Sequence, residues 1–104
     1  MAKVRWTIQS IRDIENIAEF IAKDSKKYAI IQTQRFFEVV GVLTSQPEIG
    51  KIVPELNRLN IKELILGNYR IIYVIKLNQE IDIITVHHSK RLLTTNPAII
   101  KRLS

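Results

Sequence analysis

The apolar run Tyr69–Lys76 ("YRIIYVIK") contains an arginine in its interior. Arginine is almost never fully buried without a partner. Arg70 is therefore either a cation on an open face of a sheet or one half of a structural ion pair. Glu63, on the preceding apolar run, could be the other half if the two runs are neighbouring strands. The sequence does not fix the register of these runs, so both interpretations of Arg70 remain open.

Two histidines and two basic residues end or follow the last apolar run, in "VHHSKR". Histidine titrates near neutral pH, so His87 or His88 could transfer protons, while Lys90 and Arg91 could contact a phosphate or an acidic partner. Because adjacent residues on a strand face opposite ways, at most one histidine shares a face with Arg70. The alternative is that one histidine packs in the core and that Lys90 and Arg91 form a solvated turn.

Other chemistry has little support in the sequence. The chain has no cysteine and no glycine-rich phosphate loop, and two adjacent histidines without suitably spaced acidic residues make a poor metal site. No apolar run approaches the roughly 20 residues that span a bilayer, and the N-terminus lacks the apolar stretch of a signal peptide. We therefore expect no cofactor, no metal ion, no membrane insertion and a cytoplasmic location.

The chain is basic, and its charge is unevenly distributed. The 104 residues carry a formal net charge of +6. Residues 1–50 contribute +1, from seven basic and six acidic residues, and residues 51–104 contribute +5, from nine basic and four acidic residues. A field of this sign favours a nucleic acid or an acidic protein as partner. The length is that of one ordinary domain, which we expect to span residues 1–104.

Hydrophobic periodicity predicts the elements that position these side chains. A period of two indicates strands, at Lys3–Thr7, Ile61–Gly67, Tyr69–Lys76 and Ile81–His88. Helical spacing and capping residues indicate helices, at Thr7–Ser25, at Lys26–Ser45 and after Asn96. The order β-α-α-β-β-β-(α) predicts an α+β fold, in which a four-stranded antiparallel sheet carries two N-terminal helices on one face.

The middle strand of this sheet should face two environments. One set of alternate side chains is wholly apolar or aromatic and is assigned to the helix side: Tyr69, Ile71, Tyr73 and Ile75. Arg70 belongs to the other set, which we place on the face that the two helices leave open.

The element order and three sequence segments together resemble the RelE/ParE superfamily of type II toxin–antitoxin toxins. The segments are Glu63–Tyr73 ("ELILGNYRIIY"), Gln46–Leu56 ("QPEIGKIVPEL") before it and "VHHSKR" after it. The resemblance implies a small cytoplasmic toxin that inhibits growth, as plasmid-stabilisation toxins do, and that a cognate acidic antitoxin neutralises. Such a toxin reaches operator DNA only through the antitoxin complex.

The superfamily divides by target, and the residues favour the ParE branch. RelE-like toxins cut messenger RNA on the ribosome, whereas ParE-like toxins block DNA gyrase without nuclease activity. Arg70 matches the sheet arginine of the superfamily, but Ile61 and Glu63 stand where RelE-like toxins present lysines, and the C-terminal tyrosine of RelE-like toxins is absent. A carboxylate near a scissile phosphate would repel it. We therefore expect a gyrase inhibitor rather than an enzyme.

The expected site residues follow from this comparison. Target binding is assigned to Arg70, Lys90 and Arg91. The alternative is a ribosome-dependent endoribonuclease, whose catalytic residues would be Arg70, His88 and Arg91. A further alternative is a toxin that has lost its toxicity.

The second predicted helix is the expected site of antitoxin binding. Its apolar residues spread over more than half of its circumference, which indicates burial on two sides or a surface kept for a partner. Antitoxin binding is assigned to Phe36, Phe37 and Val40, with core packing as the alternative for the two phenylalanines.

Overall fold

The computed structural model describes residues 1–103. The strands are β1 (Val4–Trp6), β2 (Lys51–Ile52), β3 (Ile61–Leu66), β4 (Tyr69–Ile75) and β5 (Ile81–His88). The helices are α1 (Ile8–Ala22), α2 (Lys26–Gly41) and α3 (Pro97–Leu103), and short 3₁₀ turns lie at Val42–Thr44 and Leu93–Thr95. No helix in this described part of the chain is long and apolar enough to cross a membrane.

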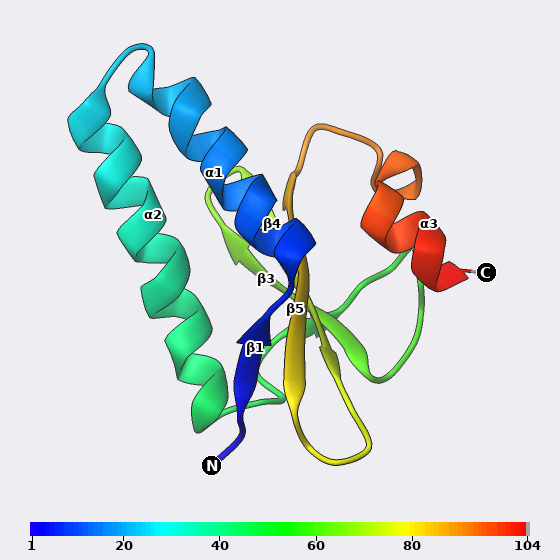
Figure 1. Cartoon of the computed structure of the whole chain (residues 1–104). Helices are drawn as coiled ribbons and strands as arrows, with labels where there is room; N and C mark the ends of the chain where they lie inside the picture. The colour runs from blue at the N-terminus through cyan, green and yellow to red at the C-terminus, as the bar shows by residue number, and fades with distance from the viewer. Residues whose placement is uncertain (104) are drawn as a thin grey trace.

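The strands form a sheet in the order β1-β5-β4-β3-β2. Strand β1 is parallel to β5, and the other neighbours are antiparallel. Figure 1 shows the α1–α2 hairpin on one face of the sheet and α3 on the other. The predicted α+β class is confirmed, although residues 1–103 contain five strands rather than four, and β1 is parallel to its neighbour rather than antiparallel as predicted. The additional strand, β2, has only two residues, which is too short to produce a detectable alternation.

Side-chain caps define where the helices begin. The Thr7 hydroxyl accepts a hydrogen bond from the Ser10 N–H at the start of α1, and the Ser25 hydroxyl accepts one from the Tyr28 N–H at the start of α2. The Asn96 side-chain oxygen accepts a hydrogen bond from the Ala98 N–H in α3. Ser25 and Asn96 thus cap the helices that were predicted to begin after them. Helix α2 ends at Gly41, earlier than predicted, because the chain tightens into a 3₁₀ turn.

The larger core lies between the α1–α2 hairpin and the sheet. Its buried members come from both helices, the following turn and the two central strands: Ile14, Phe36, Val40, Leu43, Ile71, Tyr73, Ile81, Ile83 and Val86. Tyr69 and Ile75 pack against this cluster, as does Trp6, whose ring meets Phe37 edge-on at 5.0 Å between centroids. The assignment of the apolar set of β4 to the helix side is confirmed.

The opposite face of the sheet is not open, which corrects the sequence-based prediction. A second cluster of buried residues covers it: Val53, Ile61, Ile72, Val74, Ile84, Leu93 and Ile99. Residues 53–60 and α3 pack back over this face. The short C-terminal helix was predicted, but its amphipathic pattern is too brief to indicate which surface it covers.

A close approach between Gly50 and Tyr73 fixes the segment before β2. The Gly50 N–H donates to the Tyr73 hydroxyl, which donates to the Pro47 carbonyl, both at 2.9 Å. A Cβ atom on Gly50 would lie 2.5 Å from the Tyr73 hydroxyl and 2.8 Å from the Glu63 carbonyl oxygen. Only glycine fits this position without a shift of its neighbours.

Candidate functional site

Arg70 lies between two carboxylates on the face opposite the α1–α2 hairpin. Its Nε donates to Glu63 at 2.5 Å, and its two terminal nitrogens donate to the two oxygens of Glu55 at 2.7 and 2.8 Å. In the β3–β4 register Arg70 is opposite Ile65, so Glu63 is its diagonal neighbour on the same face. The interpretation of Arg70 and Glu63 as a cross-strand ion pair is therefore confirmed.

Glu55 is the partner that sequence reasoning missed. It lies in the irregular segment between β2 and β3, where no periodicity indicates which way a side chain points. The bidentate contact from Arg70 lowers the pKa of Glu55 to about 2. The same hydrogen bonds raise the pKa of Arg70 above its ordinary value, although its partial burial acts in the opposite direction. In the sequence, the position of Glu55 directly after Pro54 indicates a turn, but it does not indicate that Glu55 pairs with Arg70.

The ion-pair cluster formed by Arg70, Glu63 and Glu55 is not a cationic site. At neutral pH its two carboxylates and one guanidinium sum to a charge of −1. The Arg70 side chain is only 12% exposed. A phosphate brought to this place would meet two carboxylates, and one contact at about 4 Å costs on the order of 4 kcal/mol at an effective dielectric of about 20. The cluster stabilises the sheet and the turn above it.

His87 is the histidine that shares a face with Arg70. The two residues are paired in the β4–β5 register, and His87 is buried. Its Nε2 is 2.9 Å from the Arg91 carbonyl oxygen, and its Nδ1 is 3.0 Å from the side-chain nitrogen of Asn96. A carbonyl can only accept, so this network assigns the ring proton to Nε2 and leaves Nδ1 to accept from Asn96. His87 thus ties the start of α3 to the sheet.

His88 lies on the opposite face, beside the α1–α2 hairpin. It is paired with Tyr69, and the two rings meet edge-on at 5.4 Å between centroids. Its Nδ1 accepts a hydrogen bond from the Lys90 N–H. The structure therefore does not bring Arg70 and His88 together, because the sheet lies between them.

Lys90 and Arg91 are exposed in the turn after β5 and line a cavity with His88. We call this cavity of about 570 Å³ the α1 hollow, and it is lined by Asn16, Ile17, Glu19, Phe20, Lys23, Tyr69, His88, Lys90 and Arg91. Three of these residues are basic and one is acidic. The ring of Phe20 is 69% exposed at its edge. The hollow can accept an apolar group and a negative charge together.

Two of the three residues assigned to antitoxin binding are in the core. Phe36 and Val40 are 0% and 2% exposed, because α2 packs against both α1 and the sheet. Only Phe37 reaches the surface, where it is 45% exposed beside Trp6. The apolar surface of α2 is therefore only partly buried, because Tyr28, Ile30 and Phe37 stay 61%, 60% and 45% exposed.

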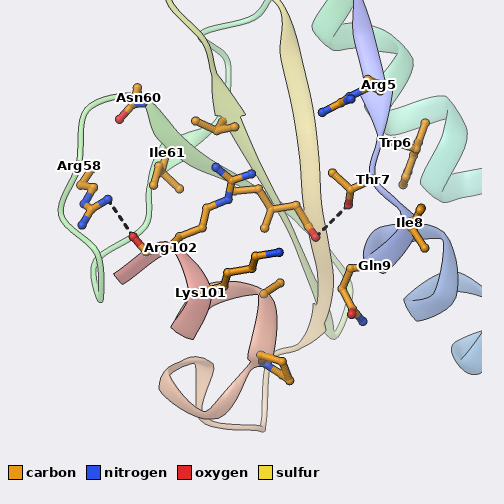
Figure 2. A pocket seen from close by; sticks show the side chains of 14 residues that line it. Arg5, Trp6, Thr7, Ile8, Gln9, Arg58, Asn60, Ile61, Lys101 and Arg102 are labelled. Atoms are coloured by element: carbon orange, nitrogen blue, oxygen red, sulfur yellow. Dashed lines mark hydrogen bonds between the residues drawn. The ribbon is translucent and has the colours of Figure 1, made fainter. Parts of the chain in front are cut away.

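A second cavity lies on the other face, between α3 and the start of α1, and sequence reasoning missed it. We call this cavity of about 830 Å³ the α3 cleft (Figure 2). It is lined by Arg5, Trp6, Thr7, Ile8, Gln9, Arg58, Asn60, Ile61, Val74, Ile84, Pro97, Ala98, Lys101 and Arg102. These residues come from separate parts of the chain. The sequence indicated only that residues 51–104 carry an excess of basic residues, not that they gather around a cavity.

Among the described residues, no group of three or more histidine, cysteine, aspartate or glutamate side chains is placed to hold a metal ion.

One protein family matches most of the chain. The family of ParE toxins of type II toxin–antitoxin systems, parDE, matches residues 4–93. The chain is 26% identical over 87 residues to a protein of Sinorhizobium fredii (strain NBRC 101917 / NGR234) named as a candidate toxin, Y4kP. This alignment covers 84% of the present chain and 88% of the relative.

Two solved structures share the fold. The chromosomal ParDE system of P. aeruginosa matches with a TM-score of 0.69 at 20% identity, covering 86% of this chain and 98% of that one. The RelBE2 toxin–antitoxin complex of Mycobacterium tuberculosis matches with a TM-score of 0.54 at 23% identity, covering 84% and 96%. Because the family match extends from β1 to the 3₁₀ turn before α3, this chain belongs to the ParE family of type II toxin–antitoxin toxins.

Proposed function

We propose that this ParE-family toxin inhibits DNA gyrase and is neutralised in the cytoplasm by a cognate acidic antitoxin. The observation that supports a non-catalytic toxin is the position of Arg70, whose guanidinium is bonded to Glu63 and Glu55. A nuclease needs cations that are free to hold a phosphate and a proton acceptor close to them. Arg70 meets neither need, because carboxylates occupy its donors and His88 is on the far side of the sheet.

Target binding is proposed at the α1 hollow. Lys90 and Arg91 are exposed there, beside the exposed ring of Phe20. Arg70, which was assigned to the same function, is proposed instead to support the sheet. Contact with operator DNA is proposed only for the complex with the antitoxin.

One observation favours a second candidate function, cleavage of messenger RNA on the ribosome. His88 lines the α1 hollow together with Lys90 and Arg91, so a group that could transfer protons lies in the same cavity as two cations. In this alternative the catalytic residues would be His88 and Arg91 without Arg70.

The test is a supercoiling assay with purified gyrase, combined with induced expression in cells without the antitoxin. We expect loss of supercoiling and filamentous growth with the wild type, and at least tenfold weaker inhibition with Lys90→Glu/Arg91→Glu. The control Lys27→Glu/Arg35→Glu makes the same charge change on the exposed surface of α2 and should inhibit like the wild type. Unaffected gyrase with rapid loss of messenger RNA would favour the nuclease, and unaffected growth would indicate lost toxicity.

A further inference from the structure

The α3 cleft combines an apolar floor with a basic rim. The floor is formed by the side chains of Ile61, Val74 and Ile84 from the sheet and Pro97 and Ala98 from α3. The rim carries the charged side chains of Arg5, Arg58, Lys101 and Arg102. Among the described residues that line the cleft, none is acidic. Figure 2 shows Arg5 on β1 and the two basic residues of α3 on opposite sides of the same space.

Hydrogen bonds hold two rim arginines in place, but only one of them, Arg58, is held without loss of its charge. Arg58 donates to the Arg102 carbonyl oxygen at 3.2 Å, and this neutral acceptor orients the guanidinium without neutralising it. Arg5 is different, because it donates to both oxygens of Asp82, at 3.1 and 2.8 Å, so its charge is largely balanced. The positive potential of the cleft therefore comes mainly from Arg58, with a contribution from Arg102 that Asp82 partly balances.

The chemistry of the cleft favours an amphipathic acidic chain over a nucleic acid. A duplex presents a continuous row of phosphates and would leave the apolar floor without a partner. A single strand binds by stacking successive bases on aromatic rings, and among the described residues that line the cleft only Trp6 is aromatic. A protein segment that alternates apolar and acidic side chains would fill the floor and pair with the rim at once. The cavity volume of about 830 Å³ is within the range of sites that hold several side chains.

We propose that the α3 cleft binds an acidic amphipathic segment of the antitoxin, which rests on the proposed function in that the partner is an acidic antitoxin. This places partner binding on the face covered by α3 rather than at Phe36 and Val40 of α2, which are buried. Docking here would add charge-assisted contacts to Arg58 and Arg102 and would shield the second hydrophobic cluster beneath them.

The first experiment uses Trp6, the only tryptophan of the chain, which lines the cleft. The toxin is titrated with the acidic product of the adjacent reading frame, with any tryptophan in that partner replaced by phenylalanine. We expect a shift of Trp6 emission that saturates with binding and an affinity that falls with added salt. Binding that leaves the Trp6 emission unchanged would overturn the proposed location.

The second experiment reverses charge on the rim. Arg58→Glu/Arg102→Glu should weaken the complex at least tenfold, whereas Lys27→Glu/Arg35→Glu on α2 should bind like the wild type. The single variant Arg58→Glu, in a loop outside the helices, repeats the test if the double variant fails to fold. Equal affinity for the cleft variants and the wild type would refute the inference and leave the antitoxin partnership intact. If the wild type forms no complex at all, the proposed function fails instead. If a single-stranded oligonucleotide displaces the partner from the wild type but not from the Arg58 and Arg102 variants, the cleft binds nucleic acid and the proposal is wrong.

Discussion

Replacing Arg70 by leucine should destabilise this fold, because the Arg70 side chain is only 12% exposed and is bonded to two carboxylates. The substitution keeps an apolar side chain over the sheet but removes the cation from between two carboxylates. Glu63 is the sensitive partner, because its side chain is 8% exposed, whereas that of Glu55 is 33% exposed. The buried carboxylate cannot recover its lost hydrogen bond from water without opening the β3–β4 pair.

The size of the effect follows from the two ion pairs of Arg70, one with Glu63 and one with Glu55. Removing one partner of a buried ion pair costs about 3–5 kcal/mol. Arg70 keeps 12% exposure, so we take the lower end, about 3 kcal/mol, for the pair with Glu63. The pair with Glu55 is discounted to about 0.5–1 kcal/mol for solvent screening. For a domain of this size 1 kcal/mol corresponds to about 4–8 °C, so Tm should fall by at least about 12 °C.

The measurement is a double-mutant cycle in urea at pH 7. Arg70→Leu, Glu63→Leu and the double variant are unfolded in parallel, and the free energy of unfolding is compared. The double variant should be about 2 kcal/mol more stable than Arg70→Leu, because it buries no unpaired charge. Free energies that add to within about 0.5 kcal/mol would refute this account, because neighbours that do not interact behave additively. A rescue of Arg70→Leu by added salt would also contradict it, since a buried charge is poorly screened.

The remaining predictions concern proton linkage, close packing and a cap. Glu55 has a lowered pKa of about 2, so its stabilisation is fully present above about pH 4.5 and is lost as the pH falls through about 2. Wild type and Glu55→Gln should therefore differ by about 1 kcal/mol in urea at pH 7 and converge near pH 2, and a constant difference would count against the linkage. Gly50→Ala should lower the free energy of unfolding by about 1–3 kcal/mol, because its methyl group collides with Tyr73. Gly41→Ala has open space around its methyl group and should raise the free energy of unfolding by up to about 1 kcal/mol; thermal melts measure both. Tyr73→Phe leaves the half-buried Gly50 N–H and Pro47 carbonyl without this partner and should cost about 1 kcal/mol. A melting temperature like that of the wild type would show that water replaces the hydroxyl. Asn96→Ala removes the cap of α3 and should cost about 1 kcal/mol with faster amide exchange in residues 97–103, while unchanged exchange would argue against its role in holding the helix.

Local patterns predicted most of the fold correctly. The β5 strand was predicted with its observed bounds, and the caps at Ser25 and Asn96 were identified, because alternation and capping depend on residues close in sequence. The end of α2 was placed too late, since the last turn of a helix is often 3₁₀ and a turn of three residues is too short to show a different period. Strand β2 was missed because two residues carry no period.

The candidate site was less predictable, because its contacts join residues far apart in the sequence. Glu63 was identified as a partner of Arg70 from its place on the preceding strand, but Glu55 was not, because it lies in an irregular turn. The sequence limited the histidines to opposite faces without showing which one joined Arg70. That choice depended on the β4–β5 register, which pairs Arg70 with His87.

The sequence by itself determined the order of the elements, the apolar face of β4 and the basic character of the second half, because these depend on residue type and short-range period. Only the tertiary structure decided that α3 covers the second face of the sheet and that both ends of the Arg70 guanidinium pair with carboxylates. It also decided that Arg58 and Arg102 meet around a cleft. Each of these outcomes depends on how distant segments pack, and packing is governed by the combined burial and pairing of the whole chain rather than by any one segment.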